Sequence, residues 1–232
     1  MTIDAILWDY DGTLVNSAPK NISVTKDILR EVAPRLFGNG LPEHLKSESK
    51  YHHVNHAAEN WRDLYTSFFG LTCEEADLAG SLWSKHQKRN TTPVAIFDGI
   101  IDVIRTFAHI PHGICSQNSS ANIQALLDVE FITSYFKFVV GYEDVPYERQ
   151  KPASNAGLMC LGKIFGEVTN KTLLVIGDHE TDVLFARNIS RDINGSNTVI
   201  SIAVSYSGAK PETWDHQPEM VISRPQELAE FL

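Results

Sequence analysis

The sequence predicts an α/β fold, a parallel β-sheet with helices on both faces and a separate helical segment inserted after the first strand. Short, nearly continuous apolar runs recur along the 232 residues, and a helix-like segment follows each of them. Such runs are typical of strands that are buried on both faces of a parallel sheet. A long stretch between the first run and the second contains helix-like patterns but no convincing strand.

The expected strands share an apolar run that ends in polar or small residues. They are Ala5–Trp8, His112–Cys115, 138–140, 173–176, Thr198–Val204 and Met220–Ile222. Between the first two, apolar side chains recur at helical spacing in residues 21–37 and 61–69, and residues 74–89 supply a third expected helix. A parallel crossover normally needs only one helix. We therefore expect a helical domain at 18–92, inserted into a sheet domain made of 1–17 and 93–232.

Composition disfavours several classes of function. The formal net charge is −9, and no run of lysine and arginine is present that would neutralise a track of phosphates, so we expect no nucleic-acid partner. No apolar stretch reaches the roughly 18 residues that a membrane-spanning helix needs, and the first residues lack the pattern of a signal peptide. The three cysteines are widely spaced, which is typical of reduced thiols. We expect a cytoplasmic protein without a membrane partner.

Polar residues follow four of the expected strands or precede the next helix. In a doubly wound sheet, ligands bind outside the carboxyl ends of the strands, where such residues converge. Asp9 and Asp11 come directly after the first strand, and Gly12 permits a tight turn there. Ser116 and Gln117 stand where the second strand meets a helix, and a hydroxyl with backbone N–H groups at a helix start suits phosphate oxygens.

The third and fourth groups add charge of both signs. Lys151 precedes the helix-like residues 153–165, where its positive charge adds to a helix start that already favours anions. Asp178 and Asp182 lie four apart, across a turn and the first turn of a helix. Two carboxylates in that arrangement suit a hard cation that prefers oxygen ligands.

These four groups, in this order, resemble the four motifs of the haloacid dehalogenase superfamily, and specifically its phosphatase branch, which includes proteins similar to phosphoglycolate phosphatase. The resemblance runs from Ile3 to about Asn188, and the inserted helices resemble the family's cap domain. The tail from Thr198 to Leu232 is similar to the family's closing strands and helix. It implies a Rossmann-like catalytic core at 1–17 and 93–232, with a helical cap at 18–92.

The resemblance implies a magnesium-dependent phosphomonoester hydrolase that acts on a small phosphorylated metabolite through an aspartyl-phosphate. Asp9 would be the nucleophile, and Asp11 would protonate the leaving alcohol and later assist the attacking water. Ser116, Lys151 and the backbone amide of Gln117 would bind the phosphoryl oxygens.

By the same resemblance, Mg²⁺ would bind the carboxylates of Asp9 and Asp178 and the backbone carbonyl of Asp11. Asp182 would support the site, either as an outer ligand or as the partner of Lys151. The four acids cannot accept a phosphate dianion without compensation. A divalent cation, Lys151 and a proton on Asp11 bring the empty site to about zero charge.

Other functions on the same fold require different residues. A dehalogenase needs no acid two residues after the nucleophile, so Asp11 disfavours that activity. A sugar phosphomutase keeps both Asp11 and the cap, and it remains an alternative. A phosphonate hydrolase would need a Schiff-base lysine in the cap, and no motif singles one out. A catalytically silent binding protein usually lacks a catalytic group, whereas all of them are present here.

Some residues depart from the family's commonest pattern or have no assigned role. The departures, which concern the subfamily rather than the chemistry, are Trp8, Gln117, Asn155 and the pair Asn188 and Ile189. His52, His53 and His56 are expected on the polar face of a cap helix, because no acid or cysteine completes a metal ligand set with them. His179 is expected near the site entrance without a catalytic role.

Overall fold

The computed structural model describes residues 2–58, 60–193 and 195–230, and the chain separates into two compact units. One unit comprises Met1–Val15 with Ile96–Leu232, and the other is Asn16–Ala95. The sequence predicts the first boundary after residue 17, two residues later than in the structure, and the second after residue 92, three residues earlier. The two connections pair as a two-stranded sheet, β2 (Val15–Asn16) with β3 (Ala95–Ile96).

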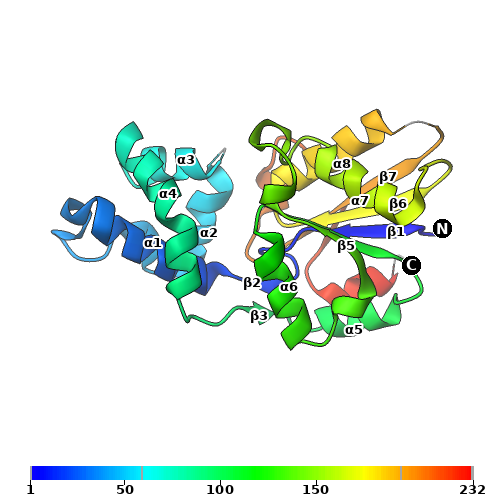
Figure 1. Ribbon diagram of the computed structural model, residues 1–232, viewed down its shortest axis with the longest axis horizontal. Helices are drawn as coiled ribbons and strands as arrows, with labels where there is room; N and C mark the ends of the chain where they lie inside the picture. Colours follow the sequence, from blue (N-terminus) through cyan, green and yellow to red (C-terminus); the bar gives the residue numbers. More distant parts are fainter. Residues whose placement is uncertain (1, 59, 194, 231–232) are drawn as a thin grey trace. The chain divides into compact units, whose positions relative to one another are not determined.

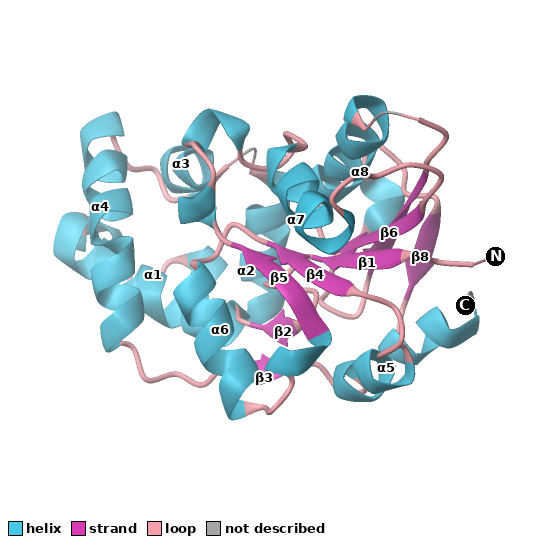
Figure 2. Cartoon of the chain, turned by 45° about the vertical axis from the view of Figure 1, so that its right-hand side comes forward, coloured by secondary structure: helices cyan, strands magenta, loops and turns pink. Residues whose placement is uncertain are grey.

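The larger unit contains a six-stranded sheet in the order β5-β4-β1-β6-β7-β8, in which all neighbouring strands are parallel. Figure 1 and Figure 2 together label its strands. The strands are β1 (Ala5–Trp8), β4 (His112–Cys115), β5 (Phe136–Val140), β6 (Thr172–Gly177), β7 (Thr198–Val204) and β8 (Met220–Ile222). The prediction of a parallel α/β sheet is therefore confirmed, and each of the six expected runs lies in a strand.

Helices cover both faces of this sheet. In Figures 1 and 2, α7 (Asn155–Phe165) and α8 (Glu180–Asp192) lie over one face, while α5 (Ile100–Thr106) and α6 (Ser120–Val129) lie on the other. Ala5 and Leu7 belong to the apolar core that side chains of α7 and α8 complete. Because side chains alternate along a strand, Ile6 and Trp8 face the opposite layer, where they are also buried. Burial on both faces explains the uninterrupted apolar sequence of β1.

Strand register brings three polar segments to one edge of the sheet. β1 pairs with both β4 and β6, and Trp8 lies opposite Ile114 on one side and Ile176 on the other. The residues that follow these strands therefore emerge at the same level. The chain passes from β1 to β4 and β5 on one side, then returns to β6 on the other side of β1. Such a reversal of direction is where open α/β sheets bind ligands.

The smaller unit is helical. Its helices are α1 (Ala18–Val32), α2 (Glu48–Ala57), α3 (Trp61–Asp63) and α4 (Cys73–Arg89), and α1 packs against α2 and α4. Their apolar faces enclose a core that includes Ile28, Leu29 and Leu45. Thr72 and Glu75 form a capping box that satisfies the first backbone N–H groups of α4. Over residues 18–58 and 60–92 the structure contains no strand, as predicted. No helix in the described part of the chain is long and apolar enough to cross a bilayer.

Three expected helices differ in detail. The prediction of one helix over residues 21–37 is wrong at the C-terminal end. The α-helix α1 stops at Val32, and a separate 3-10 helix occupies Pro34–Phe37. Pro34 lacks an N–H group and its ring would clash with the preceding turn, which ends the α-helix. The helical stripe at 61–69 divides into α3 and a π-helical segment at Leu64–Phe68. The closing helix expected near the C-terminus is a 3-10 helix at Pro225–Glu230.

A buried histidine links the first two strands of the core. His112 is fully buried, its Nδ1 accepts a hydrogen bond from Trp8 Nε1 at 2.9 Å, and its Nε2 donates to Phe107 O at 3.0 Å. This pattern requires the neutral ring. Burial lowers the pKa of His112 to about 4.

We predict that His112 makes the fold less stable in mild acid. The folded pKa lies below the value of about 6.5 for an unfolded histidine, so this contribution to stability is present above pH 6.5 and lost as the pH falls toward 4. Urea unfolding at pH 7.5 and pH 5 should show a loss of about 2 kcal/mol attributable to this residue. His112→Gln, which keeps a donor and an acceptor but does not titrate, should remove that part of the pH dependence. An unchanged dependence in the variant would contradict the assignment.

Candidate active site

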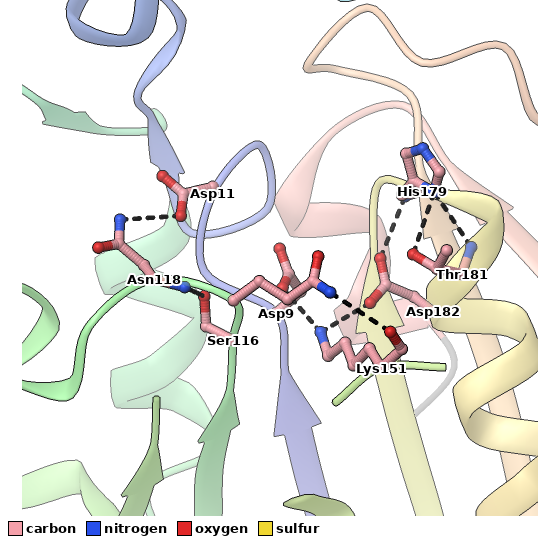
Figure 3. A network of polar contacts seen from close by, with 9 residues as sticks. Asp9, Asp11, Ser116, Asn118, Lys151, His179, Thr181 and Asp182 are labelled. Carbon is pink, nitrogen blue, oxygen red and sulfur yellow. Dashed lines mark hydrogen bonds and ion pairs between the residues drawn. The ribbon is translucent and has the colours of Figure 1, made fainter. Parts of the chain in front are cut away.

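Asp9 is the first residue beyond β1. Its backbone N–H donates to Ile176 O at 2.8 Å and so extends the pairing of β1 with β6 by one residue. This bond fixes the direction in which the side chain leaves the strand. Only 13% of the Asp9 side chain is exposed. The sheet thus presents a largely buried carboxylate at its carboxyl edge, in the centre of Figure 3.

The Lys151 ammonium is the positive centre of the site. Its Nζ lies 2.7 Å from Asp9 Oδ1 and 2.7 Å from Asp182 Oδ1, and its side chain is 5% exposed (Figure 3). The same atom lies 5.3 Å from the centre of the Phe185 ring on α8, within the range of a cation–π interaction. One lysine therefore joins the end of β1 to the first turn of α8.

Two side chains hold the backbone around this lysine. Gln117 Nε2 donates to Lys151 O at 3.3 Å, and Asn188 Nδ2 donates to Pro152 O at 2.8 Å. Gln117 and Asn188 are both among the departures from the common pattern of the family. In this chain they contact consecutive carbonyl groups, so the departures share one structural role.

Burial and neighbouring charges shift the pKa values of the central pair. Burial raises the pKa of Asp9 well above its usual range, and the nearby Asp182 and Asp178 carboxylates raise it further, while Lys151 opposes them. Burial alone would lower the pKa of Lys151, but Asp182 and Asp9 outweigh it and hold the pKa above its usual value. The lysine is therefore a permanent cation in a site that carries an excess of acids.

A tight loop after Asp9 depends on Gly12. Gly12 has φ of +78°, and its N–H donates to Val15 O at 2.8 Å. A Cβ atom at this position would lie 2.0 Å from Asp178 Oδ2. Glycine is thus required both for the backbone conformation and for the close approach of the Asp178 carboxylate. The first and fourth motifs meet at this point.

Asp9, Asp178 and Asp182 form an acidic cluster. Each offers a carboxylate oxygen, and these atoms lie within 4.8 Å of one another. A set made of oxygen donors fits Mg²⁺, which prefers carboxylates and retained waters. Lys151 supplies one positive charge for three carboxylates, so the cluster favours a further cation. The donor chemistry thus fits the predicted metal.

The hydrogen bonds of Asp182 distinguish it from the other two acids. Its Oδ1 binds Lys151, and its Oδ2 accepts from the His179 backbone N–H at 3.1 Å. A Cβ on Gly177 would lie 2.1 Å from the carboxyl carbon of Asp182, so this acid packs directly on the end of β6. Both oxygens thus serve the lysine and the helix start. Of the two roles left open by the sequence, this contact favours the partner of Lys151.

Ser116 and Asp11 meet through a residue that the sequence analysis did not assign. Asn118 donates its backbone N–H to Ser116 Oγ at 3.0 Å and its side-chain Nδ2 to Asp11 Oδ2 at 2.9 Å (Figure 3). Ser116 is buried, and its own N–H continues the sheet by donating to Val140 O at 3.0 Å. All the predicted site residues therefore emerge at the carboxyl edge of the sheet, in two groups, around Lys151 and around Asn118.

The end of β7 contributes two more residues that were missed. Tyr206 donates its hydroxyl to Thr13 O at 2.7 Å, and Ser207 Oγ donates to Asp178 Oδ2 at 3.3 Å. Burial raises the pKa of Tyr206, as do Asp178 and Asp9, so the phenol keeps its proton and remains a donor. The rule that ligand-binding residues follow parallel strands would have identified both, had it been applied to Thr198–Val204.

The histidines noted in the sequence do not belong to a group of metal ligands among the described residues. His179 is the N-cap of α8, and its Nδ1 accepts a hydrogen bond from the Thr181 backbone N–H at 3.1 Å. His52 and His56 lie on α2 with ring centres 5.6 Å apart. Among the described residues, the acidic cluster at Asp9 is the only group of three or more His, Cys, Asp or Glu side chains with the spacing of metal ligands.

The profile of the haloacid dehalogenase-like hydrolase family matches residues 6–193. This chain therefore belongs to the haloacid dehalogenase-like hydrolases, as its four motifs indicated. One curated relative, phosphoglycolate phosphatase 1 of Pseudomonas aeruginosa, is 22% identical over 187 residues. The match covers 78% of this chain but 65% of the relative, slightly less than two thirds of its length.

Solved structures of similar proteins share the fold over nearly the whole chain. A predicted phosphoglycolate phosphatase from Haemophilus somnus is 16% identical, with a TM-score of 0.74 and coverage of 100% of this chain and 99% of that one. A haloacid dehalogenase-like family hydrolase from Streptococcus pneumoniae is 17% identical, with a TM-score of 0.74 and 99% coverage of both chains. At these identities, the similarity shows the fold.

We predict that Lys151 stabilises the metal-free protein more than an ordinary surface lysine does. Lys151→Met would leave two largely buried carboxylates without their cation, which typically costs about 3 kcal/mol or more. The matched control is Lys171→Met, because Lys171 pairs with Asp4 at 2.9 Å but is 31% exposed. The free energy of unfolding should fall by less than about 1 kcal/mol in Lys171→Met. Urea unfolding in EDTA at pH 8 measures both. Equal losses of unfolding free energy in the two variants would show that Lys151 stabilises the protein no more than Lys171 does.

Proposed function

We propose that this protein is a magnesium-dependent phosphatase that hydrolyses a small phosphate ester through an aspartyl-phosphate on Asp9. The observation that carries the proposal is the contact of the Asp9 carboxylate with the Lys151 ammonium, whose side chain is 5% exposed, at the edge of the sheet. A nucleophile and a fixed positive charge are thereby adjacent. Membership of a hydrolase family supports the reaction class, and the matched relative named phosphoglycolate phosphatase supports a phosphate ester.

The positive and polar groups around Asp9 suit a phosphoryl group. Lys151 would bind one phosphoryl oxygen, and Ser116 Oγ, with the Gln117 N–H, would bind another. These groups are fixed by the fold before a substrate arrives. They would therefore stabilise charge that develops on the phosphoryl oxygens without reorganising.

The reaction would proceed in two displacements. An Asp9 oxygen forms a bond to phosphorus while the bond from phosphorus to the ester oxygen breaks, and Asp11 gives its proton to the departing alkoxide. Water then attacks the phosphorus of the aspartyl-phosphate and gives a proton to Asp11. The bond from phosphorus to Asp9 breaks, which restores the Asp9 carboxylate and releases inorganic phosphate. Asp11 acts as acid in the first step and as base in the second.

The carboxylates of Asp9 and Asp178 and the backbone carbonyl of Asp11 would hold Mg²⁺. When bound, the ion supplies positive charge that offsets the acids and the phosphate dianion. Ser207 would keep the Asp178 carboxylate oriented through its hydroxyl hydrogen bond. Gly12 would keep space for that carboxylate.

The helical unit would act as the cap, with residues 18–92 as its proposed extent. Every proposed catalytic residue lies in the other unit, which supports a role for the helices in selecting the substrate rather than in the chemistry. Caps of this kind also exclude water during reaction. Phosphoglycolate is the first substrate to test, because a matched relative carries that activity in its name.

We predict that the purified protein releases inorganic phosphate from a panel of phosphomonoesters in Mg²⁺ and that EDTA abolishes the release. Restoring Mg²⁺ should restore it, because the acids cannot accept a phosphate dianion alone. Asp178→Asn should require more Mg²⁺ for half-maximal rate, whereas the exposed Asp215→Asn should match the unchanged protein. Full activity in metal-stripped protein would overturn the magnesium requirement. Transfer of phosphate within a sugar phosphate, without release, would instead identify a phosphomutase.

A further inference from the structure

Asn118 links the proposed acid to the proposed phosphate-binding serine, through its side chain to Asp11 and through its backbone N–H to Ser116. Its Nδ2 donates to Asp11 Oδ2 at 2.9 Å, across 107 positions of sequence. Its backbone N–H donates to Ser116 Oγ at 3.0 Å. Figure 3 shows the Asp11 and Asn118 side chains pointing toward each other.

The orientation of the Asn118 amide is determined by its other contacts. Its Oδ1 accepts hydrogen bonds from the Ser119 backbone N–H at 2.8 Å and from Asn122 Nδ2 at 3.2 Å. Two donors thus face the oxygen, and the NH₂ group must face Asp11. The backbone carbonyl oxygen of Asn118 accepts a hydrogen bond from the Tyr142 N–H at 3.0 Å. These three hydrogen bonds, none of which involves Asp11, therefore hold Asn118 in place.

We propose that Asn118 is a positioning residue that orients Asp11 for proton transfer. This inference rests on the phosphatase function proposed above. Because Asn118 donates to Asp11 Oδ2, the amide fixes the orientation of the carboxyl group. The proton passes from Asp11 to the departing alkoxide as the ester bond breaks, and Asp11 takes a proton from the attacking water in the second step. Asn118 itself gains and loses no proton.

The same residue couples the acid to the phosphate position. Ser116 Oγ, which would contact the phosphoryl group, is hydrogen-bonded to the Asn118 backbone, while the Asn118 side chain fixes Asp11. The distance between acid and phosphoryl group is therefore set through one residue. Small errors in such a distance are costly, since a misplacement of about 1 Å can reduce a rate about 100-fold.

The test uses two substrates that differ in their need for an acid. An alkyl phosphate needs a proton on its leaving group, whereas p-nitrophenolate departs without one. Asp11→Asn should lose roughly 10²–10⁴-fold in kcat/KM with the alkyl phosphate and much less with p-nitrophenyl phosphate. Asn118→Ala should show the same selectivity with a smaller loss, about 10- to 100-fold for the alkyl phosphate. In the double variant, Asn118→Ala should add no selective loss beyond that of Asp11→Asn, since it acts through Asp11.

Two further variants keep the result independent of folding. Asn118→Asp has the same shape and keeps an acceptor for the Ser119 N–H, but it turns a carboxylate toward Asp11 and should give at least the selective loss of Asn118→Ala. Ser119→Ala removes the side-chain cap of α6, where Ser119 Oγ accepts from the Asn122 N–H at 3.1 Å. Ser119→Ala should lower stability by about 1 kcal/mol, and any loss in kcat/KM should be equal for the two substrates.

The outcomes separate this inference from the proposed function. Absence of magnesium-dependent turnover in the unchanged protein would refute the function itself. A selective loss in Asp11→Asn together with equal losses for both substrates in Asn118→Ala and Asn118→Asp would refute only the role of Asn118. Additive selective losses in the double variant would refute it as well, because Asn118 would then act independently of Asp11.

Discussion

The contact of the Lys151 ammonium with the carboxylates of Asp9 and Asp182 is the constraint on which the rest of the site depends. Three acids at one sheet edge repel one another, and a lysine that is 5% exposed is costly to bury without partners. Each charge is tolerable because the others are present. These charges also determine which ligands the site can bind. An anion placed here contacts the Lys151 ammonium, and the acidic cluster beside it favours a second cation. In the proposed reaction, a divalent cation would offset the excess of acids when a phosphate dianion binds.

Several local features follow from this constraint. Gly12 has no side chain where Asp178 must approach, and Gly177 leaves room for Asp182 at the end of β6. The His179 backbone N–H occupies the second oxygen of Asp182, so that acid stays turned toward Lys151. Gln117 and Asn188 hold the carbonyl groups of Lys151 and Pro152, which keeps the lysine's backbone in place. These residues come from four different strand ends or helices. Their convergence explains why the larger unit needs a precise strand register, and why the polar segments follow strands that are apolar throughout.

The sequence was sufficient for the sheet and for the convergence of the predicted polar segments at its carboxyl edge, but not for the contacts between them. The strands could be predicted because burial on both faces leaves an unbroken apolar run, as in Ala5–Trp8. The rule that ligand-binding residues follow the carboxyl ends of parallel strands then predicted that Asp9, Ser116 and Asp178 lie on one edge. The end of α1 at Val32 was missed although Pro34 marks it, because the apolar stripe continued past the proline. Tyr206 and Ser207 were missed because the carboxyl-end rule was not applied to Thr198–Val204. Asn118 was missed for a different reason, because its contact with Asp11 depends on how two separate loops fold, and no period or spacing encodes that. The catalytic roles of the predicted site residues stay predictions.

The central claim is that Asp9 carries the phosphoryl group during turnover, and chemical trapping tests it most directly. The protein would be mixed with a substrate from the active panel in Mg²⁺, quenched in acid within one turnover and treated with borohydride, which reduces an acyl phosphate of aspartate to homoserine. Peptide mass spectrometry then locates the modified residue. We predict homoserine at position 9, dependent on both substrate and Mg²⁺, and none in Asp9→Asn. Turnover without any modification at position 9, or modification at another carboxylate, would contradict the account.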